Sequence, residues 1–562
     1  MTAWPGSLLT PAEDFDEDFS MLLGKENVMN YQNRRFRLWQ AVALFGLLAL
    51  PALAVHNRHL LATGFASQTP ATRTGQPNII FILTDDLDAD EIRYMPNLKA
   101  LLADRGLTLN NYLVNVSLCC PSRTSTLRGQ YAHNTQVTGN NLPDGGFEKV
   151  LQLGLEKSTV ATWLQAAGYQ TMLAGKYLNG YPHGADLTYV PPGWSEWYSP
   201  ARGNAYGEFN YTLNENGKLV YYGNNPEDYG TDVYGRKAAD FIERTAKEGK
   251  PFFAWLATYA PHGPATPAPR HAGLFPGARA PRGPSFNEAD VSDKPAYIRN
   301  RPLLTAAQIA RIDEAYRRRL QSLQAVDELI ARLVGTLIST GQLDNTYIFF
   351  TSDNGFHLGQ HRLMPGKQAP YEEDIRVSLI VRGPGVPQGR TLDHLAGNID
   401  LAPTWAELGG AKAPDFVDGR SLLPLLGRNP TPVSAWRQAF LLQHGSQSQP
   451  PLVEIGHRGP ITADSNGEGL LEPVDPQNDP ALVQRPRAIP PFTGLRTQRY
   501  TYVQYATGER ELYDLRSDPD QLKNIAGGAD PVLLWRLARQ LVELRHCAVA
   551  GCRASENGSP DP

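Results

Sequence analysis

The chain has 562 residues, with 53 Lys and Arg against 57 Asp and Glu, and a formal net charge of -4. A chain of this length can bury one large core plus a smaller domain. The weak net charge and the lack of a long Lys/Arg run argue against nucleic acid as a partner, and no nucleic-acid-binding motif is present.

The first apolar segment, residues 38–55, carries no charge, follows three arginines and closes with small residues. This pattern is typical of a secretory signal peptide, and the segment is also long enough for a marginal membrane span. The polar N-terminal segment 1–37 is unusual before a cleaved signal. Either the true start is Met21 or Met29, or residues 38–55 are an uncleaved signal anchor with the basic side in the cytosol. Both explanations carry the body of the chain across a membrane.

After a polar linker at 56–76, the run Asn78–Thr84 is continuously apolar and of strand length. Such runs are typical of strands that are buried on both faces in a parallel sheet. Helical patterns occupy 95–105, 158–167 and 306–340. Further short strands are predicted at 171–176, 252–258, 346–352 and 377–381. Strands that alternate with helices predict a layered α/β sheet with helices on both faces.

The character of the chain changes after about residue 426. Polar, proline-rich loops are predicted for 427–491. Antiparallel strands follow at 500–505 and 511–515, then a helix at 531–545. We therefore expect a small α+β subdomain over 426–553, followed by a tail at 554–562.

Cys547 and Cys552 lie close together near the C-terminus. The short spacing favours a small local disulfide in an oxidising compartment, and the alternative is a pair of thiols. Sequons for N-glycosylation begin at Asn115, Asn210 and Asn557. The first lies beside Cys119 and the last is followed by Pro560, so both are discounted.

The most informative stretch is Cys119-Cys120-Pro121-Ser122-Arg123, which continues to Gly129. Proline suits the first turn of a helix, which places both cysteines at or just before a helix N-terminus. Backbone N–H groups and the helix dipole favour an anion there, and Arg123 adds positive charge. The stretch suits a reactive group that attacks an anionic substrate. The alternative is a buried cysteine pair that caps an ordinary helix.

Polar side chains also follow two of the predicted buried strands. Asp85 and Asp86 come directly after the first, and Asp353 and Asn354 come directly after a later one. Active sites of open α/β sheets lie at the carboxyl ends of strands, so these oxygens are expected to converge there. Converging carboxylates need a cation, and oxygen ligands select Ca²⁺ or Mg²⁺. The alternative is that each Asp is a helix N-cap.

Three basic positions occupy the same kind of place. Lys176 ends a predicted strand, His262 follows the strand at 252–258, and Lys367 lies in the loop after Asp353. Lys and Arg can hold the oxygens of an anionic ester, and a protonated His can assist the departing alcohol.

Together these motifs resemble the type I sulfatases, over nearly the whole region 78–524. The family signature is C-x-P-S-R, followed by an L-T-G-like end. The resemblance implies that Cys119 is oxidised to formylglycine (3-oxoalanine), whose hydrate is the nucleophile, with Cys120 at the variable position. One departure is visible, because Arg128 stands where the family usually has Thr.

The resemblance also implies an alkaline-phosphatase-like mixed sheet sandwiched by helices, with the catalytic domain at 77–425 and a smaller α+β C-terminal domain. It implies one Ca²⁺ per chain, with Mg²⁺ possible, and modified Cys119 joins the other metal ligands, which are Asp85, Asp86, Asp353 and Asn354. Arg123 and Lys176 match residues that support the formylglycine, and His262 and Lys367 match residues that contact the sulfate. The run 511–515, with Asp518 and Asn524, resembles the family's C-terminal "ELYDL…DP…N" segment.

Four segments are similar to the N-acetylglucosamine-6-sulfatase branch and related arylsulfatases; they are 175–179, 191–194, 352–360 and 398–404. Many other sulfatases have a His two residues after the Lys that Lys176 matches. Leu178 occupies that place here. Asn179 and His357 are the candidates to replace it and are expected to bind substrate.

The predicted function is hydrolysis of aryl or carbohydrate sulfate esters, including N-acetylglucosamine 6-sulfate units of glycans, with release of inorganic sulfate. One alternative is a phosphonate or phosphate monoester hydrolase of the same superfamily, and the other is a glycan-binding homologue without catalysis. The expected partners are a sulfated small molecule or polysaccharide and the formylglycine-generating enzyme, with membrane contact only through residues 38–55 if uncleaved. The expected location is the secretory pathway, with a secreted, periplasmic or cell-wall, lysosome-like or lumenal anchored product.

Overall fold

The computed structural model describes residues 75–445 and 489–559. The predicted signal or anchor segment 38–55 lies outside these residues, as does the polar segment 1–37. Among the helices of the described ranges, none combines the length and the apolar character that crossing a bilayer requires.

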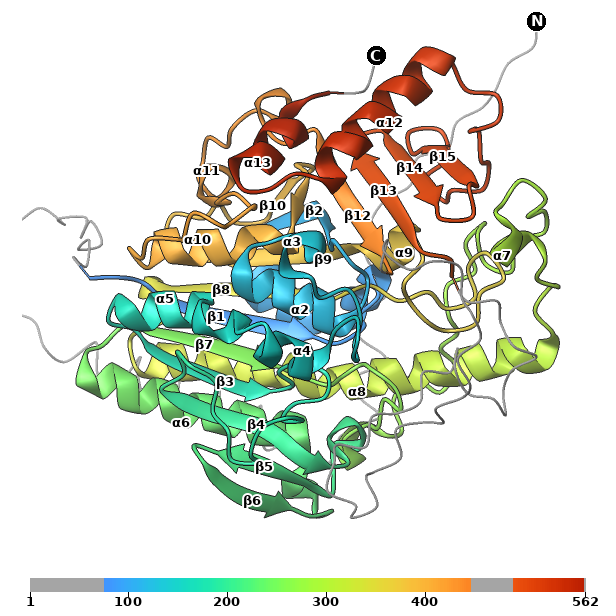
Figure 1. Cartoon of the computed structure of the whole chain (residues 1–562). Coiled ribbons are helices and arrows are strands. Elements are labelled where there is room, and N and C mark those ends of the chain that lie inside the picture. The colour runs from blue at the N-terminus through green and yellow to red at the C-terminus, as the bar shows by residue number, and fades with distance from the viewer. Residues whose placement is uncertain (1–74, 446–488, 560–562) are drawn as a thin grey trace, which may run out of the picture. The chain divides into compact units, whose positions relative to one another are not determined.

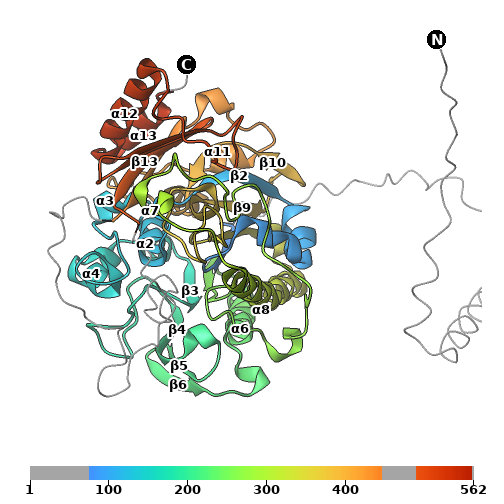
Figure 2. The ribbon, with the colours of Figure 1, turned by 90° about the vertical axis from the view of Figure 1, so that its right-hand side faces the viewer.

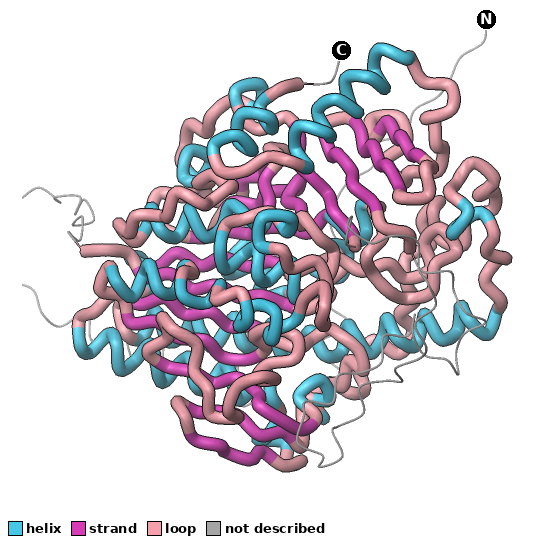
Figure 3. The backbone as a smooth tube through the Cα atoms, viewed as in Figure 1, coloured by secondary structure: helices cyan, strands magenta, loops and turns pink. Residues whose placement is uncertain are grey.

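The chain folds around a large mixed sheet, shown in Figure 1 and coloured by element type in Figure 3. Its strand order is β10-β2-β9-β8-β1-β7-β3-β4-β5-β6, and β11 pairs with β2. The strands are β1 (Asn78–Thr84), β2 (Leu107–Leu113), β3 (Gln170–Gly175), β4 (Glu196–Gly203), β5 (Tyr211–Glu215), β6 (Lys218–Tyr222), β7 (Phe252–Ala257), β8 (Thr346–Ser352), β9 (Arg376–Arg382), β10 (Arg390–Leu392) and β11 (Ala396–Gly397).

The centre of the sheet is parallel. β1 pairs in parallel with β7 on one side and with β8 on the other, and β3 pairs in parallel with β7 and β4. All residues of β1 and β7 are buried, as their continuous apolar runs predict. The carboxyl ends of β8, β1, β7 and β3 therefore lie next to one another at one edge of the sheet.

Helices cover both faces, as expected. Figure 2 shows α2 (Cys119–Arg128) and α4 (Gly146–Gln152) on one side of the sheet, and α6 (Gly230–Glu248) and α8 (Ala306–Ser339) on the other. Ile79, Phe81 and Leu83 of β1 pack with α5 (Val160–Ala166) and α10 (Leu401–Leu408), whereas Ile80 and Ile82 pack with α6 and α8. The remaining α-helices of this part are short; they are α3 (Ala132–Thr135), α7 (Ala296–Arg299), α9 (Glu372–Ile375) and α11 (Leu423–Leu426).

Two sequence predictions need correction. The helix expected over 95–105 is a single π-helical turn, Leu98–Ala103, which follows a 3-10 helix at Ala89–Tyr94. The loop expected throughout 427–491 is interrupted by β12 (Ala439–His444), a strand too short to distinguish by sequence from its proline-rich surroundings.

A second, antiparallel sheet follows toward the C-terminus, in the order β12-β13-β14-β15. It contains β13 (Phe492–Thr497), β14 (Tyr500–Tyr505) and β15 (Arg510–Asp514), and it packs with α12 (Pro531–Arg545) and α13 (Ala550–Asn557). The α+β character of this part agrees with the sequence, while the boundary at 425/426 stays a prediction.

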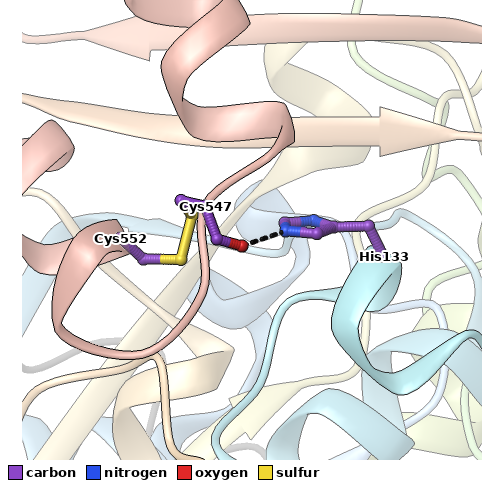
Figure 4. A group of neighbouring side chains, drawn as sticks. All are labelled: His133, Cys547 and Cys552. Atoms are coloured by element: carbon purple, nitrogen blue, oxygen red, sulfur yellow. Dashed lines mark hydrogen bonds between the residues drawn. A yellow bond between two sulfur atoms is a disulfide. The ribbon is translucent and has the colours of Figure 1, made fainter.

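Cys547 and Cys552 form a disulfide between α12 and α13, the pairing that their spacing favours. Figure 4 shows the ring of His133 beside it, with Nε2 at 2.9 Å from the carbonyl oxygen of Cys547. His133 belongs to α3, so the segment between α12 and α13 packs near the end of α2. Because both sulfurs are consumed in the disulfide, the group of His133, Cys547 and Cys552 is not a metal site.

Asn115, the first sequon residue, is buried. Its Nδ2 donates to the carbonyl of Leu441 at 2.9 Å, and its Oδ1 accepts from the backbone N–H of Ala132 at 2.8 Å. A glycan has no room there. Asn210 and Asn557 are exposed.

Candidate active site

The predicted site residues come from neighbouring parallel strands. Asp85 and Asp86 follow β1, Asp353 and Asn354 follow β8, Lys176 follows β3, and His262 lies in the loop after β7. Because these strands are adjacent and point the same way, their side chains converge at one edge of the sheet. The N-terminal turn of α2 brings Cys119 to the same edge, and the loop after β8 brings Lys367.

Hydrogen bonds from a backbone N–H and a side-chain amide fix the carboxylates of Asp353 and Asp86. The backbone N–H of Asp86 donates to Asp353 Oδ1 at 3.1 Å, and Asn354 Nδ2 donates to Asp86 Oδ1 at 2.7 Å. The helix that begins after this loop is capped by Asp88, whose side chain accepts from the N–H of Asp90. Asp85 and Asp86 are therefore not N-caps.

Cys119 is the first residue of α2, as predicted for a reactive group at a helix N-terminus. Its Sγ lies 3.2 Å from Asp85 Oδ1 and 2.7 Å from Lys367 Nζ. Burial and the charge of Asp85 raise the pKa of the Cys119 thiol well above its ordinary value. A raised pKa disfavours the thiolate, the form in which an unmodified cysteine acts as a nucleophile.

Cys120 has a different environment, although it is the next residue. Its side chain belongs to the hydrophobic core on this face of the sheet, and its backbone N–H donates to Asn140 Oδ1 at 3.0 Å. Cys120 thus packs the helix, whereas Cys119 faces the charged cluster.

Three buried cations contact the carboxylates. Lys176 Nζ lies 2.5 Å from Asp85 Oδ2, and Lys367 Nζ lies 2.5 Å from Asp86 Oδ1. Arg123 Nε donates to Asp353 Oδ2 at 2.8 Å, and its Nη1 donates to the carbonyl of Lys176 at 2.8 Å. Three carboxylates thus face three cations, which makes this burial of charge tolerable.

The pKa values reflect this balance. Burial alone would raise the pKa of Asp85, but Lys176, His262 and Arg123 hold it well below its ordinary value. Burial and the neighbouring charge of Asp85 raise the pKa of Asp353 to about 6. The pKa of Lys367 stays well above its ordinary value despite burial, because Asp86 lies against it.

The oxygen donors of the cluster, which belong to Asp85, Asp86 and Asn354, fit a hard divalent cation. Ligand atoms of Asp85, Asp86, Cys119 and His262 all lie within 4.8 Å of one another. Asn354 Oδ1 is buried and makes no hydrogen bond, so an amide oxygen in this loop has a site for a further partner. Carboxylate and amide oxygens are the ligands that Ca²⁺ and Mg²⁺ prefer.

His262 marks the open side of the cluster. Its side chain is 17% exposed, whereas the side chains of Lys367, Lys176 and the carboxylates are at most 6% exposed. His262 Nε2 lies 3.5 Å from Asp86 Oδ2. The ring of Tyr206, which the sequence did not single out, packs 4.9 Å from the His262 ring and 5.0 Å from Lys176 Nζ.

Asn179 and His357, the two candidates to replace the missing family histidine, are buried near the cluster. Their hydrogen bonds go to residues outside it. Asn179 Nδ2 lies 3.5 Å from the hydroxyl of Tyr206, so Asn179 reaches the cluster through that ring. His357 Nδ1 lies 2.8 Å from Asp374 Oδ1. Asn179 Oδ1 and His357 Nε2 are both buried without a hydrogen bond. Leu178 itself packs in the hydrophobic core.

The departure at Arg128 has a structural explanation. Arg128 Nη1 donates to the carbonyls of Leu155 and Ser158, at 2.8 and 2.7 Å, and the guanidinium lies 4.2 Å from the ring centre of Phe416. Arg128 therefore ties the end of α2 to a neighbouring loop, away from the charged cluster.

A family model described as Sulfatase matches residues 77–411, more than half of the chain. The chain belongs to the sulfatase family. This sulfatase is 36% identical over 503 residues to N-acetylglucosamine-6-sulfatase of Homo sapiens, which covers 86% of this chain and 87% of that protein. It is 35% identical over 532 residues to an arylsulfatase of Volvox carteri, covering 88% and 78% of the two chains.

Solved structures agree. BT4656, described in complex with its substrate D-glucosamine-2-N,6-O-disulfate, superposes with a TM-score of 0.66 and 25% identity, covering 84% of this chain and 98% of that chain. A phosphonate monoester hydrolase from Silicibacter pomeroyi has the same fold, with a TM-score of 0.59 and 24% identity over 84% of this chain and 95% of that one. The predicted alkaline-phosphatase-like fold and the prediction of a sulfatase are thus confirmed, and the protein is an enzyme that hydrolyses sulfate esters.

Proposed function

We propose that this sulfatase removes 6-O-sulfate from N-acetylglucosamine units of glycans, with Cys119 converted to formylglycine and a Ca²⁺ ion held by the carboxyl-end oxygens. The observation that carries the proposal is the position of Cys119 Sγ, in contact with both Asp85 and Lys367 at the edge where four parallel strands end.

The oxygens that would hold the ion belong to Asp85, Asp86, Asp353 and Asn354. Mg²⁺ usually keeps several waters and uses one or two carboxylates, whereas Ca²⁺ accepts a larger set of protein oxygens. A buried set of three carboxylates and one amide therefore favours Ca²⁺. When bound, the ion supplies positive charge against the sulfate oxygens. The hydrated aldehyde at residue 119 supplies a hydroxyl nucleophile.

The protein's own cations have complementary tasks. Lys176, Lys367 and Arg123 are buried, charged and fixed by ion pairs, so they can hold the non-bridging oxygens of a sulfate without reorganising. The alcohol that leaves when the S–O bond breaks needs a proton. His262 is suited to donate it, because its ring lies on the open side where the sugar would approach.

The substrate class rests on the relatives. Human N-acetylglucosamine-6-sulfatase matches this chain over most of both lengths, and BT4656 was solved with a 6-O-sulfated glucosamine. Asn179 and His357, with their unsatisfied buried atoms, are proposed to contribute to substrate binding in place of the missing family histidine.

We also propose that the protein travels through the secretory pathway, where the formylglycine-generating enzyme acts on Cys119. An extracellular sulfatase homologue of Drosophila melanogaster is 36% identical over 400 residues, which covers 70% of this chain and 35% of that protein. The disulfide between Cys547 and Cys552 fits an oxidising compartment.

Hydrolysis of three probes tests the proposal: N-acetylglucosamine 6-sulfate and an aryl sulfate, followed by sulfate release, and an aryl phosphonate, followed by release of the phenol. The enzyme would be produced together with a formylglycine-generating enzyme, and Cys119→Ala serves as the inactive control. We expect the highest kcat/KM on the 6-sulfated sugar. A higher value on the phosphonate would overturn the proposed ester class, and a higher value on the aryl sulfate would overturn the glycan assignment alone.

A further inference from the structure

A buried arginine on the long helix α8 lies beneath the site without belonging to it. Arg319 is only 3% exposed and occupies the face of α8 that carries Tyr316, Leu320 and Leu323, all buried. A charged side chain on such a face needs partners, because an uncompensated buried charge is strongly destabilising.

Its first partner is the carboxylate of Glu91, which is fully buried. Arg319 Nε lies 2.7 Å from Glu91 Oε1, and Arg319 Nη2 lies 2.7 Å from Glu91 Oε2. This is the two-pronged pairing that a planar guanidinium makes with a carboxylate. The pair neutralises itself, so the remaining N–H groups of Arg319 are available for other acceptors.

Those remaining N–H groups reach the loops that carry the proposed site. Arg319 Nη2 also donates to the backbone carbonyl of Asp86, and Nη1 donates to the carbonyl of Pro261 at 3.3 Å. The ring centre of Phe356 lies 4.3 Å from the guanidinium carbon. Asp86 is a proposed metal ligand, Pro261 directly precedes His262, and Phe356 lies two residues after Asn354. One side chain therefore touches all three loops.

The contact with Asp86 supports a backbone conformation that is unfavourable by itself. Asp86 has a φ of 64°, a left-handed conformation that non-glycine residues seldom adopt. Such a conformation persists only where its surroundings hold it. The hydrogen bond from Arg319 to the carbonyl of Asp86 is one such restraint, and the bond from the N–H of Asp86 to Asp353 is another.

We propose that Arg319, with Glu91 as its counter-charge, is a positioning residue that fixes the Asp86 carboxylate relative to His262 and Asn354. The inference rests on the proposed metal site and on the proposed role of His262. A lysine at this position would keep the positive charge but lose the planar guanidinium with its several N–H groups. It could not donate hydrogen bonds to Glu91, Asp86 and Pro261 together.

The test compares Arg319→Lys with a matched control, Arg437→Lys. Arg437 is also fully buried, and its guanidinium bonds to Asp400 at 2.5 and 2.7 Å and to Glu556 at 2.9 Å. Within the described residues, none of its hydrogen bonds reaches the three site loops. For each protein we would measure kcat and KM on one sulfate ester and the melting temperature. We would also remove bound metal with a chelator, add back CaCl₂, and find the concentration that gives half of the resulting rise in melting temperature.

We expect Arg319→Lys to lower kcat by about 10- to 100-fold with little change in KM, and to raise the half-saturating CaCl₂ concentration by a similar factor. Arg437→Lys should lose melting temperature but keep kcat within about threefold. Equal kcat values in the two variants would overturn the positioning role. A wild-type protein that does not respond to CaCl₂ would contradict the metal proposal, and the comparison of kcat would still decide the role of Arg319.

If Arg319→Lys does not fold, Phe356→Leu takes its place. This change removes the aromatic face from the guanidinium and leaves the Arg319–Glu91 pair intact. We expect kcat to fall and the half-saturating CaCl₂ concentration to rise, both by less than in Arg319→Lys. Unchanged kcat and an unchanged CaCl₂ requirement in folded Phe356→Leu would overturn the proposal.

Discussion

At the scale of the residue, the site is a set of opposite charges that the fold forces together. Lys367 is the clearest case, since its ammonium group contacts both the Cys119 sulfur and the Asp86 carboxylate. A group in that position can hold a sulfate oxygen beside the nucleophile. A neutral side chain of similar length could fill the space but could not supply the charge.

Lys367→Met should therefore lower kcat by about 10²- to 10³-fold, the usual cost of removing a preorganised charge from an active site. Lys294→Met is the control, because Lys294 is also fully buried but bonds to the Tyr513 hydroxyl at 3.1 Å and to the Leu522 carbonyl at 3.0 Å. Steady-state kinetics and melting temperatures check the pair. The control should lose melting temperature and keep kcat, and equal loss of kcat in both variants would contradict the role given to Lys367.

Arg128→Thr, which restores the residue usual in the family, should destabilise this protein. It removes the hydrogen bonds to the carbonyls of Leu155 and Ser158 and the contact with Phe416. The expected loss is about 1–3 kcal/mol of unfolding free energy, with kcat/KM unchanged, since charged hydrogen bonds are worth about that much. Urea unfolding monitored by tryptophan fluorescence measures it. A large loss of kcat/KM without loss of stability would show that Arg128 serves the site instead.

At the scale of the element, each loop of the site is held by a strand, a helix or the second sheet. The segment after Lys367 leads to α9 and carries Tyr371, whose hydroxyl donates to Glu511 of β15 at 2.9 Å. Tyr505 and Tyr513 donate to the same carboxylate, at 2.6 and 2.5 Å. The "ELYDL" run thus joins the antiparallel sheet to the segment that follows Lys367.

Glu511→Ala leaves three buried tyrosine hydroxyls without this acceptor. We expect a loss of about 3 kcal/mol or more of unfolding free energy, at roughly 1 kcal/mol for each hydrogen bond. Glu509→Ala, two residues away and partly exposed, should cost less than about 1 kcal/mol. Thermal and urea unfolding of both variants provide the comparison. Similar losses in the two would mean that the tyrosine cluster contributes nothing specific.

A buried acid that lies against the start of α6, Glu208, makes stability depend on pH. Burial raises the pKa of Glu208 from 4.5 to about 8, although its carboxylate accepts from the N–H of Thr231 at 2.7 Å. A raised folded-state pKa means that the folded state holds the proton longer than the unfolded chain does. The stability that this proton provides is complete below pH 4.5 and is lost as the pH rises toward 8.

Glu208→Gln should remove that dependence, because the amide cannot ionise and its oxygen can still accept from Thr231. Relative to the variant, wild type should lose up to about 1.4 kcal/mol for each pH unit between these two values. Urea unfolding at pH 5 and at pH 8 measures the difference between the two proteins. A gap that stays constant between pH 5 and pH 8 would contradict the raised pKa.

At the scale of the whole molecule, much of the fold and the cluster could be predicted from the sequence. Continuous apolar runs located β1, β7 and β8, and residues placed directly after such strands had to meet at one edge of a parallel sheet. Asp85, Asp353 and Lys176 meet there for this reason. Strands β4 to β6 and β12 were missed, since strands this short leave little periodic signal.

The sequence also did not predict the residues that support the site side chains from neighbouring elements. Arg319 stands in a run of three arginines on α8, and composition alone groups it with its exposed neighbours. The signal that distinguishes it is its helical spacing, since it shares a face with Tyr316 and Leu323 rather than with Arg318. Tyr206 had no such signal, because its contacts with Lys176 and His262 depend on how the chain turns between β4 and β5.

The central claim is that residue 119 works as formylglycine rather than as cysteine. Mass spectrometry of the peptide that contains residue 119, taken from preparations of different specific activity, tests it most directly. We predict a fraction in which the sulfur of Cys119 has been replaced by an aldehyde oxygen, and sulfate release in proportion to that fraction, with none from Cys119→Ala. Full activity in a preparation whose residue 119 is entirely unmodified thiol would contradict the claim.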